Sequence, residues 1–439
     1  MKLCVVGDFP FSAITNHSEE CDENTAFLLT NLSRKYLSLA KAKTPHIIES
    51  NDLFTYISLT GIKIIGITGT NGKSTVASMI GFALHSLGSS VATLGTLGFF
   101  INEQQVFKNA NTTPDTLELY SYILQAREAQ CEYFVMEVSS HAIAQNRIAG
   151  LEFTAKIITN ITQDHLDFHK NIEEYRAVKN AFLQDSGCMI ANGDDENIEI
   201  GQSICTYGTQ KSAFLQAQAN SSSSNIQATL VLGHEKCEFS SPLIGNFNLS
   251  NFLASILCIQ QITDHSLAKI SKILEDFRGI PGRMEVVSRN PLVIVDFAHT
   301  PDGMQKVLEV FAGKKICVLF GAGGNRDKAK RAIMGRVADT YAQKIYLTND
   351  NPREEDEKKI IAGILAGITH KEKVTIISQR KEASKRALQY IVQESCDALL
   401  VLGKGSETTQ EIKGTKLAYQ DKQVIQKLLR ENIEREKYL

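Results

Sequence analysis

The sequence has little excess of charge of either sign, and it has no long apolar run. Its 439 residues carry 47 lysines and arginines against 49 aspartates and glutamates, which gives a formal net charge of −2. Proteins that bind nucleic acid usually present a clearly basic face, so we expect no nucleic-acid partner. No stretch of about 18 consecutive apolar residues occurs, so we also expect no membrane-spanning helix and no membrane partner.

The cysteines lack the spacing of a metal or redox site. Nine are scattered without a Cys-x-x-Cys pair, and their odd number fits reduced thiols in a cytosol. Cys131, Cys317 and Cys396 lie in apolar runs, where packing is their expected role. The apolar start of the chain reaches Asp8 at once, which is too short for a signal peptide. A cytoplasmic location is therefore expected.

Apolar strands alternate with helical segments in two stretches of the chain. Such alternation predicts parallel sheets covered on both faces. In the first stretch, the expected strands cover residues 62–68, 90–96, 133–138 and 155–160, and the expected helices cover 73–87, 114–129 and 172–183. In the second, the strands cover 292–297, 315–321, 344–348, 374–378 and 398–402, and the helices cover 301–311, 327–342, 355–365 and 381–394.

The length of the chain points to about three domains. The sequence therefore predicts an α/β protein with three parts. These are a small N-terminal α/β domain (1–58), a central P-loop ATPase-like parallel-sheet domain (59–287) and a C-terminal Rossmann-like domain (288–439). The low-complexity segment at 220–225, "NSSSSN", is interpreted as the tip of a hairpin.

The most specific local motif is "GITGTNGKST", residues 66–75. A strand leads into a glycine-rich turn whose amides can surround phosphate oxygens, and a helix then begins with its positive end towards the anion. Lys73 would reach the terminal phosphates, and the Ser74 hydroxyl would bind Mg²⁺. The strict P-loop pattern has glycine where Ile67 stands, and a plain glycine-rich turn is the alternative.

Acidic and histidine side chains occur at the ends of the expected strands 133–138 and 155–160. Glu137 ends an apolar run, in the position where nucleotide enzymes keep a carboxylate for Mg²⁺. Asp164, His165, Asp167 and His169 lie within six residues at another strand end. The spacing from His165 to His169 could hold zinc, but no third ligand follows at a metalloprotease spacing. The neighbouring phosphate loop favours a magnesium role for Glu137 and His165.

The stretch "NDNPREED", residues 349–356, allows two interpretations. It could start a helix, with Pro352 at an early helical position and Glu354, Glu355 and Asp356 at the positive end. Alternatively, Arg353 and its neighbours could bind a charged small molecule.

The sequence resembles the Mur ligase family in ten motifs. They occur in the same order as in that family and cover about residues 60–410. They are GTNGKS, NTTPD (111–115), MEVSSHAIAQNR (136–147), TNITQDHLDFH (159–169), GNFNLSN (245–251), PGRMEV (281–286), VDFAHTPD (295–302), GAGGNRDKAKR (321–331), DNPR (350–353) and GKGSE (403–407). Within the family, the sequence is most similar to the subgroup that adds diaminopimelate.

The resemblance implies an ATP-dependent amide ligase of peptidoglycan precursor synthesis. ATP would phosphorylate the γ-carboxylate of D-glutamate in UDP-MurNAc-L-Ala-D-Glu, and the amine of meso-diaminopimelate would attack the acyl phosphate. ATP, Mg²⁺ and a carbamylated lysine at Lys179 are the implied cofactors, and a monomer is expected. The residues alone would make Lys179 a solvated helix lysine.

The resemblance also implies roles for residues of four kinds. The catalytic residues are Lys73, Glu137, His165 and Lys179, and the metal ligands are Ser74, Glu137, His165 and carbamylated Lys179. The ATP contacts are Gly69, Thr70, Asn71, Gly72, Lys73, Ser74, Thr75, Asn248, Asn251, Arg283, Asp296 and His299. The contacts with the dipeptide nucleotide are Ser18, Asn111, Thr112, Thr113, Ser139, Gln145 and Arg147. The contacts with diaminopimelate are Arg326, Asp350, Asn351, Pro352, Arg353, Gly403 and Glu407.

Two positions depart from the family pattern. The family's uridine-binding pattern is replaced here by Asn16-His17-Ser18-Glu19, in which only Ser18 matches the family. In the last motif, Ser406 stands where the family more often has histidine. Alternative functions are a lysine-adding Mur ligase, a folylpolyglutamate synthetase, and a non-catalytic nucleotide-binding or regulatory protein of the same fold. Diaminopimelate has one more carboxylate than lysine, and the planar fork of Arg353 suits that group.

Overall fold

The structure, a computed structural model, describes residues 1–108, 111–164, 168–184, 187–219 and 226–436. The chain divides into two compact units. Unit 1 comprises Met1–Thr162, Lys170–Ser241 and Asn248–Phe277, and unit 2 comprises Gln163–His169, Pro242–Phe247 and Arg278–Leu439. Within the described residues, no helix combines the length and the apolar character needed to cross a membrane.

Unit 1 begins with a small sheet. Its strands, in spatial order, are β1 (Lys2–Cys4), β2 (Ala13–Thr15), β3 (Thr25–Leu29) and β4 (His46–Glu49). Short helices lie between these strands, namely η1 (Ser18–Glu20), η2 (Arg34–Tyr36) and α1 (Leu37–Lys41), and two more follow β4, namely η3 (Ser50–Asp52) and α2 (Leu53–Tyr56). Apolar side chains of this sheet share a core with Leu117 and Tyr120 of α4 (Thr116–Glu128). The small sheet therefore completes its core against the next layer of unit 1.

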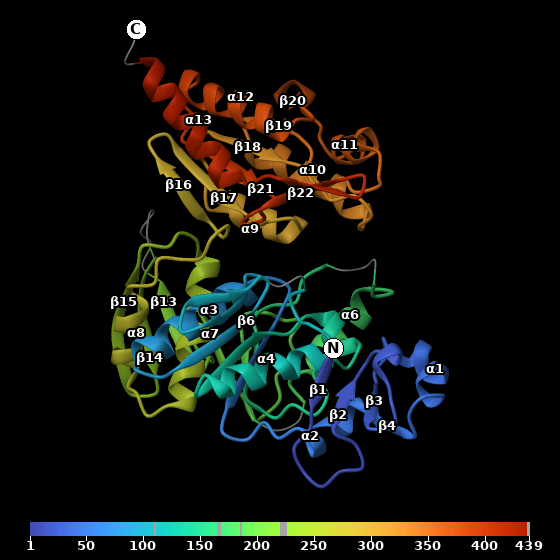
Figure 1. Ribbon diagram of the computed structural model, residues 1–439. Coiled ribbons are helices and arrows are strands. Elements are labelled where there is room, and N and C mark those ends of the chain that lie inside the picture. Colours follow the sequence, from blue (N-terminus) through green and yellow to red (C-terminus); the bar gives the residue numbers. More distant parts are fainter. Residues whose placement is uncertain (109–110, 165–167, 185–186, 220–225, 437–439) are drawn as a thin grey trace. The chain divides into compact units, whose positions relative to one another are not determined.

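The main sheet of unit 1 is parallel in its centre and antiparallel at both edges (Figure 1). In spatial order, its described strands are β15 (Glu235–Ser241), β14 (Ile226–Leu232), β13 (Leu215–Ala219), β12 (Ile204–Gly208), β11 (Cys188–Asn192), β10 (Phe153–Ile158), β5 (Lys63–Thr68), β9 (Tyr133–Glu137), β6 (Val91–Gly95), β7 (Gly98–Ile101) and β8 (Gln104–Phe107). Its helices, besides α4, are α3 (Lys73–Ser86), α5 (Ser140–Ala144), α6 (Ile172–Ala181), α7 (Asn246–Ile262) and α8 (Leu267–Leu274).

The centre of this sheet places the candidate site. β5 lies between β9 and β10, and the three run parallel. β5 is buried from Ile64 to Thr68, as expected for a strand covered on both faces. The carboxyl ends of the three strands therefore meet at one edge, and the loop after β5 has β9 on one side and β10 on the other.

Unit 2 is built on a sheet whose central strands are parallel. In spatial order, its described strands are β16 (Glu285–Arg289), β17 (Leu292–Asp296), β21 (Ala398–Leu402), β18 (Ile316–Phe320), β19 (Lys344–Leu347) and β20 (Val374–Ile376). A hairpin of β22 (Thr409–Ile412) and β23 (Thr415–Ala418) lies apart from this sheet. The helices are α9 (Pro301–Glu309), α10 (Ala329–Tyr341), α11 (Glu357–Leu365), η4 (Lys371–Lys373), α12 (Arg380–Gln393) and α13 (Asp421–Glu436).

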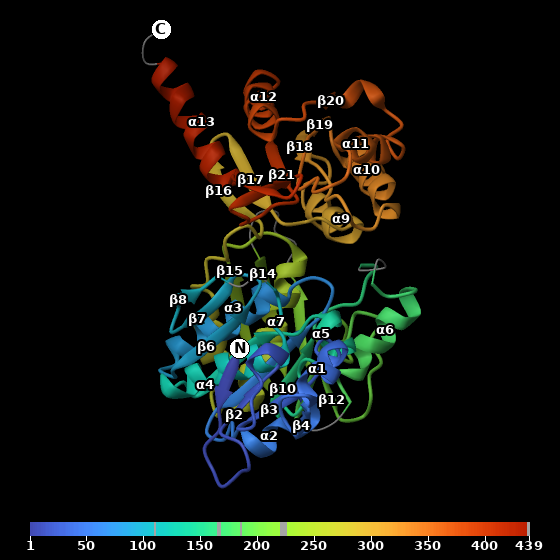
Figure 2. The same cartoon turned by 45° about the vertical axis from the view of Figure 1, so that its right-hand side comes forward.

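Helices cover both faces of the unit 2 sheet (Figures 1 and 2). α9, α10 and α11 pack on one face, against alternate residues such as Ile294 and Val318. α12 and α13 pack on the other face, against Val295 and Leu319. This two-sided cover is the arrangement of a doubly wound fold, in which ligands bind at the carboxyl ends of the strands.

All of the strands and helices expected from the two alternating stretches are present, with ends shifted by a few residues. The expected hairpin is also present, because β13 and β14 pair antiparallel; its tip, 220–225, lies outside the described residues. Cys131 and Cys317 are buried, and Cys396 packs against an apolar core, as expected. The interpretation that Pro352 stands at an early helical position was wrong. Asp356 is the N-cap of α11, so Pro352 precedes the helix by several residues. The three-domain boundaries stay a prediction.

Candidate active site

The glycine-rich loop joins β5 to α3 through backbone that glycine alone adopts comfortably. Gly69 and Gly72 have φ of +143° and +90°. A Cβ at Gly72 would lie 2.5 Å from Oδ1 of Asn251, and one at Gly69 would collide with the Thr159 hydroxyl. Both glycines are therefore required by their conformation and by close neighbours. The contact with Gly72 also brings Asn251, and Asn248 to which it donates a 3.2 Å hydrogen bond, to the phosphate loop.

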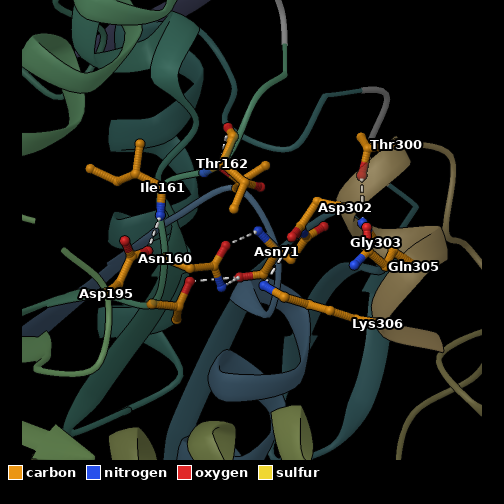
Figure 3. Close-up of polar contacts among 12 residues, drawn as sticks. Asn71, Asn160, Ile161, Thr162, Asp195, Thr300, Asp302, Gly303, Gln305 and Lys306 are labelled. Atoms are coloured by element: carbon orange, nitrogen blue, oxygen red, sulfur yellow. Dashed lines mark hydrogen bonds and ion pairs between the residues drawn. The ribbon is translucent and has the colours of Figure 1, made fainter. Parts of the chain in front are cut away.

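The residues that follow β10 hold this loop in place (Figure 3). The Asn71 amide donates to Oδ1 of Asn160 at 2.9 Å, and Nδ2 of Asn160 donates to the Asn71 carbonyl at 3.0 Å. The Thr159 hydroxyl reaches the same carbonyl at 2.6 Å. Next along the chain, the Ile161 amide donates to Asp195 at 2.7 Å. Hydrogen bonds with Thr159 and Asn160 thus fix the backbone of the phosphate loop at Asn71.

The first turn of α3 has the features of an anion site. The N-cap residue is Gly72, which has no side chain to cap the helix, and the first turn contains no acidic residue. Nζ of Lys73 donates to the carbonyls of Gly69 and Thr70, at 2.8 and 3.0 Å. Ser74 and Thr75 are buried in the same turn. Uncapped amides and an adjacent lysine at a helix N-terminus are suited to bind phosphate.

Glu137 lies beside this loop because β9 pairs with β5, opposite Ile67. Its carboxylate is buried and accepts hydrogen bonds from the Thr96 amide at 2.8 Å and the Thr96 hydroxyl at 3.3 Å. Thr96 follows β6, the next strand of the sheet. A carboxylate held at this edge is a suitable ligand for Mg²⁺, which takes oxygen ligands and prefers one or two carboxylates with phosphate oxygens and water.

Lys179 is not the solvated lysine that the residues alone suggested. Its side chain is 1% exposed, and Nζ donates to the hydroxyl of Thr68, the last residue of β5, at 3.3 Å. It also lies over the ring of Tyr175, 5.0 Å from its centre, and the Tyr175 hydroxyl is 3.0 Å from that of Thr70. α6 therefore brings Lys179 to the carboxyl end of β5, next to the phosphate loop.

The structure describes some of the residues that are expected to bind magnesium. Ser74, Glu137 and Lys179 gather at the ends of β5 and β9, whereas His165 and Asp167 lie outside the described residues. His169 is buried. Among the described residues, no three His, Cys, Asp or Glu side chains form a group that could hold a metal ion. The hydroxyl and carboxylate present nevertheless fit an ion that completes its ligands with phosphate oxygens and water.

A second set of expected residues is connected to Glu137 by hydrogen bonds. The Thr113 hydroxyl donates to the Glu137 carbonyl at 2.9 Å and accepts from the Ser139 amide at 3.0 Å. Nη1 of Arg147 donates to the Thr113 carbonyl at 2.7 Å, and its other donors reach Oε1 of Gln145. Burial lowers the pKa of Arg147. The hydroxyl of Ser139 caps α5 by accepting from the Ala142 amide.

The remaining residues expected to bind the nucleotide lie around NTTPD. The Thr112 hydroxyl is 3.0 Å from that of Thr96, and Asn111 is exposed. Nδ2 of Asn16 donates to Asp115 at 3.0 Å, which links the N-terminal segment to NTTPD. Ser18 is buried two residues further along the chain. The structure therefore brings this part of the N-terminal sheet to the same motif.

In unit 2, the expected ATP contacts cluster at the end of β17. Asp296 is buried and accepts from the amides of Met284 and Ala298, at 2.6 and 2.7 Å. Burial raises its pKa, against the effect of the Arg283 guanidinium. Arg283 stacks on Phe297, 4.4 Å from the ring centre, and burial lowers the pKa of His299 to about 4. Thr300 then caps α9 by accepting from the Gly303 amide at 3.1 Å (Figure 3).

The GKGSE and DNPR motifs meet at the carboxyl ends of β21 and β19. Gly403 has φ of +107°, and a Cβ there would lie 2.5 Å from Oδ2 of Asp350. Asp350 is buried, which raises its pKa. Nδ2 of Asn351 donates to Oε2 of Glu407 at 2.8 Å. Asp350, Asn351, Gly403 and Glu407 are thus brought together as expected for one site.

Arg353 is held beside the GAGGNRD loop. Nη1 donates to the Gly324 carbonyl at 2.7 Å, and Nε is 3.6 Å from Oε2 of Glu411. A Cβ at Gly323 would lie 3.1 Å from Nη1 of Arg353 and 3.6 Å from Cγ of Arg326. Both arginines therefore lie close to Gly323.

The acids after Arg353 have different functions. Asp356 caps α11 by accepting from the Lys358 amide, as expected for a helix start. Glu355 was expected only to favour the positive end of the helix, but it also forms an ion pair with Arg331. Its two oxygens accept from Nη1 and Nη2 of buried Arg331, each at 2.7 Å, and the Asn325 amide adds a third bond. Glu355 therefore joins the DNPR loop to α10.

Several polar residues around these contacts were not predicted from the sequence. Lys404, Gln410 and Glu411 contact the DNPR backbone or side chains, and buried Arg380 pairs with Asp421 at 2.8 Å. Lys404 lies inside GKGSE, so the motif contained the signal. Gln410, Glu411 and Asp421 stand outside every motif, and their sequence neighbourhood gives no comparable sign.

Models of two family domains match most of the chain. The Mur ligase middle domain matches residues 67–259, and the Mur ligase, glutamate ligase domain matches residues 282–405. The chain belongs to the Mur ligase family. Members of this family are ATP-dependent ligases, so the chain is an ATP-dependent ligase.

Curated relatives of this Mur ligase are similar over nearly their whole length. The UDP-N-acetylmuramoyl-L-alanyl-D-glutamate–2,6-diaminopimelate ligases of Helicobacter pylori (strain J99) and Wolinella succinogenes are 45% and 44% identical to it. Each match covers 94% of this chain and 95% of the relative.

Solved structures give the same family. A structure of a UDP-N-acetylmuramoyl-L-alanyl-D-glutamate–2,6-diaminopimelate ligase is 26% identical, with a TM-score of 0.66 over 97% of this chain and 95% of that chain. A folylpolyglutamate synthase from Mycobacterium tuberculosis has a TM-score of 0.62 at 15% identity, over 81% of this chain and 91% of that chain. The latter likeness shows the fold alone.

Proposed function

We propose that the protein joins meso-diaminopimelate to the γ-carboxylate of D-glutamate in UDP-MurNAc-L-Ala-D-Glu, with ATP converted to ADP and phosphate, as a monomer in the cytoplasm. The observation that carries the proposal is the 45% identity, over 94% of the chain, with a ligase named for this dipeptide nucleotide and 2,6-diaminopimelate. The division into domains at 1–58, 59–287 and 288–439 is part of the proposal.

The chemistry requires the carboxylate to be activated. Transfer of the γ-phosphoryl group of ATP to a carboxylate oxygen gives an acyl phosphate and ADP. The amine then attacks the carbonyl carbon, loses a proton, and phosphate leaves with the electrons of the carbon–oxygen bond. Lys73 and the amides of Gly69 to Thr75 hold the phosphates, which is supported by the glycine N-cap of α3 and by the lack of an acidic residue in its first turn.

Magnesium binding is proposed at Ser74, Glu137, His165 and carbamylated Lys179. When bound, Mg²⁺ would offset the charges of the two anions that meet in the transfer. The burial of Lys179 at the end of β5 supports the carbamate, because a free buried ammonium would oppose a cation nearby, whereas a carbamate supplies a negative ligand.

Recognition of the amino acid is proposed for Arg326, Asp350, Asn351, Pro352, Arg353, Gly403 and Glu407. The carboxylate that distinguishes diaminopimelate from lysine requires a cation, and the two arginines beside Gly323 support this assignment. The acidic and amide side chains of the group are suited to ammonium groups. The residues that the motifs assign to the dipeptide nucleotide and to ATP are proposed for those roles.

An amino-acid panel with purified protein, ATP and UDP-MurNAc-L-Ala-D-Glu tests the proposal. We expect phosphate release and a new amide product with meso-diaminopimelate, and little with L-lysine. Preference for L-lysine would instead support the lysine-adding alternative. Phosphate release that is indifferent to both the nucleotide and the amino acid would contradict the proposed reaction.

A further inference from the structure

Lys404 is a fully buried lysine in the middle of the GKGSE turn. Its side chain is 0% exposed, although lysine is almost never buried completely without a partner. Nζ donates to Oε2 of Glu407 at 2.7 Å and to Oδ1 of Asn351 at 3.1 Å. Both partners belong to the proposed amino-acid site, but Lys404 itself is covered.

Asn351 closes a triangle with these two residues. Its Nδ2 donates to the same Oε2 of Glu407 at 2.8 Å, and its Oδ1 also accepts from the Glu411 amide at 3.0 Å. The orientation of the Asn351 amide is therefore fixed, because one end accepts from Lys404 and Glu411 while the other donates to Glu407. Swapping its two ends would break all three contacts.

Glu407 consequently has one anchored oxygen and one available oxygen. Oε2 accepts two hydrogen bonds, whereas Oε1 accepts none from the described residues. The side chain is 37% exposed. A carboxylate in this state presents a directed acceptor to a cationic ligand, and it loses little rotational freedom when the ligand binds.

The charges around Lys404 explain why it can stay buried. Asp350 lies beside Gly403, and both Lys404 and Arg380 lower its pKa against the larger opposite effect of burial. Arg380 in turn pairs with Asp421 at the start of α13. Removal of the Lys404 ammonium would therefore leave Oε2 of Glu407 with the Asn351 hydrogen bond but without its charged donor, and Asp350 with one fewer cation nearby.

We propose that Lys404 is a positioning residue for the amino-acid substrate, since its buried ammonium fixes Glu407 and Asn351 so that the free Glu407 oxygen receives an ammonium group of that substrate. This inference rests on the proposed function and names a residue that acts through Glu407 without touching the ligand. A purely structural lysine would instead affect folding or all substrates alike.

Steady-state assays with Lys404→Met separate these two roles. We expect the KM for diaminopimelate to rise ~10- to 100-fold, as for loss of a hydrogen-bonded charged contact, while the KM for ATP stays within about twofold. Lys404→Gln keeps a donor without the charge, so its KM should lie between those of the wild type and Lys404→Met. Lys373→Met is the matched control, because that lysine of unit 2 contacts Asp339 outside the site.

A double-mutant cycle tests whether Lys404 acts through Glu407. In a Glu407→Gln background, Lys404→Met should raise the KM for diaminopimelate by a much smaller factor than in the wild type. Equal factors in both backgrounds, or an unchanged KM in the single variants, would overturn the inference. If Lys404→Met does not fold, the Lys404→Gln variant supplies the same cycle.

The wild-type assay separates failure of this inference from failure of the proposed function. A wild-type protein that forms no amide with diaminopimelate would contradict the proposed function. A wild type that forms it, with variants whose KM for diaminopimelate is unchanged, would contradict the role of Lys404 while the proposed function stands.

Discussion

At the scale of single residues, Arg353 combines an unusual backbone with a partly engaged side chain. Its φ is +51°, which is uncommon for a residue other than glycine. The Glu411 carbonyl accepts from its amide at 3.1 Å, and the Gly324 carbonyl and the Glu411 carboxylate contact its guanidinium. This left-handed conformation, supported from both sides, fixes the guanidinium while some of its donors stay available for a ligand.

Arg353→Ala should therefore weaken binding of diaminopimelate selectively. Loss of a charged contact of this kind costs about 2–5 kcal/mol, so the KM for diaminopimelate should rise at least tenfold. The KM for ATP should change little, because Arg353 is proposed to bind the amino acid and not the phosphates. Steady-state kinetics with each substrate varied in turn measure both values.

The control for this substitution is Arg386→Ala, which removes an exposed arginine of the same unit that pairs with Glu382. It should leave all KM values unchanged. An Arg353→Ala variant with wild-type affinity for diaminopimelate would remove Arg353 from the amino-acid site.

Lys179 gives a second prediction at this scale. Lys179→Ala should abolish most of the activity, because a buried group at the end of β5 is lost. If the lysine acts as a carbamate, added formate or acetate should restore part of the activity by supplying a carboxylate in the vacated space. Phosphate release with and without these anions is the measurement.

Lys170→Ala provides the comparison, since Lys170 is exposed and precedes α6. It should retain full activity and show no response to formate. Full activity of Lys179→Ala without any added anion would exclude a catalytic or metal-binding role for Lys179.

At the scale of elements, the loop between β19 and α11 is held by a buried ion pair. Both oxygens of Glu355 bind Arg331 of α10, and the Glu355 side chain is 11% exposed. The hydrogen bond from Arg331 is the main cause that lowers the pKa of Glu355 to about 2, from an ordinary 4.5. This ion pair therefore fixes the DNPR loop to α10. Neither DNPR nor GAGGNRDKAKR, the motif that contains Arg331, predicts the pair by itself.

The depressed pKa predicts how the stabilising contribution of Glu355 depends on pH. The carboxylate favours the folded state above the pKa of the unfolded chain, and this contribution is lost as pH falls from about 4.5 towards 2. Glu355→Gln should thus lower the free energy of unfolding by about 3 kcal/mol near pH 7. The difference from wild type should shrink as the pH approaches 2.

Urea unfolding of both proteins at several pH values measures this difference. Glu354→Gln is the control, because the carboxylate of Glu354, next to Glu355 in the chain, makes no ion pair with another described residue. This variant should show no comparable pH-dependent difference from wild type. A Glu355→Gln difference that is constant down to pH 2 would show that Glu355 contributes through packing and not through its charge.

The elements also show what sequence patterns can and cannot predict. The strands and helices of both alternating stretches were found because apolar strands alternate there with segments of helical periodicity. α7 was missed because Asn248, Leu249 and the residues from Asn251 to Ile259 are buried, which leaves no polar face to mark a helical period. The strands of the N-terminal sheet were weak signals because β1 and β2 have three residues each.

At the scale of the whole molecule, motif order predicted the family, and the structure adds contacts between segments far apart in sequence. Lys404 and Asn351 are separated by 53 positions, and Arg331 and Glu355 by 24. Local patterns cannot reveal such contacts, since they arise when the strand ends meet at one edge of the sheet. The motifs therefore marked residues that the structure brings together at these strand ends, but not the residues that orient them.

The proposed reaction assigns its two steps to different residues, and hydroxylamine can separate these steps. In the presence of ATP and UDP-MurNAc-L-Ala-D-Glu but no diaminopimelate, hydroxylamine should trap the acyl phosphate as a hydroxamate and release phosphate. Arg353→Ala should still form the hydroxamate, because its expected defect is in binding the amino acid. Lys73→Ala should form almost none, since the phosphate loop loses its lysine.

A colorimetric hydroxamate assay measures this step for the wild type and both variants, and omission of ATP gives the background. If Arg353→Ala lost hydroxamate formation to the same extent as Lys73→Ala, Arg353 would be needed for activation of the carboxylate. In that case the amino-acid site and the activation step could not be assigned to separate residues. Retained hydroxamate with lost amide product would instead place the defect after the acyl phosphate, at the step where the amine attacks.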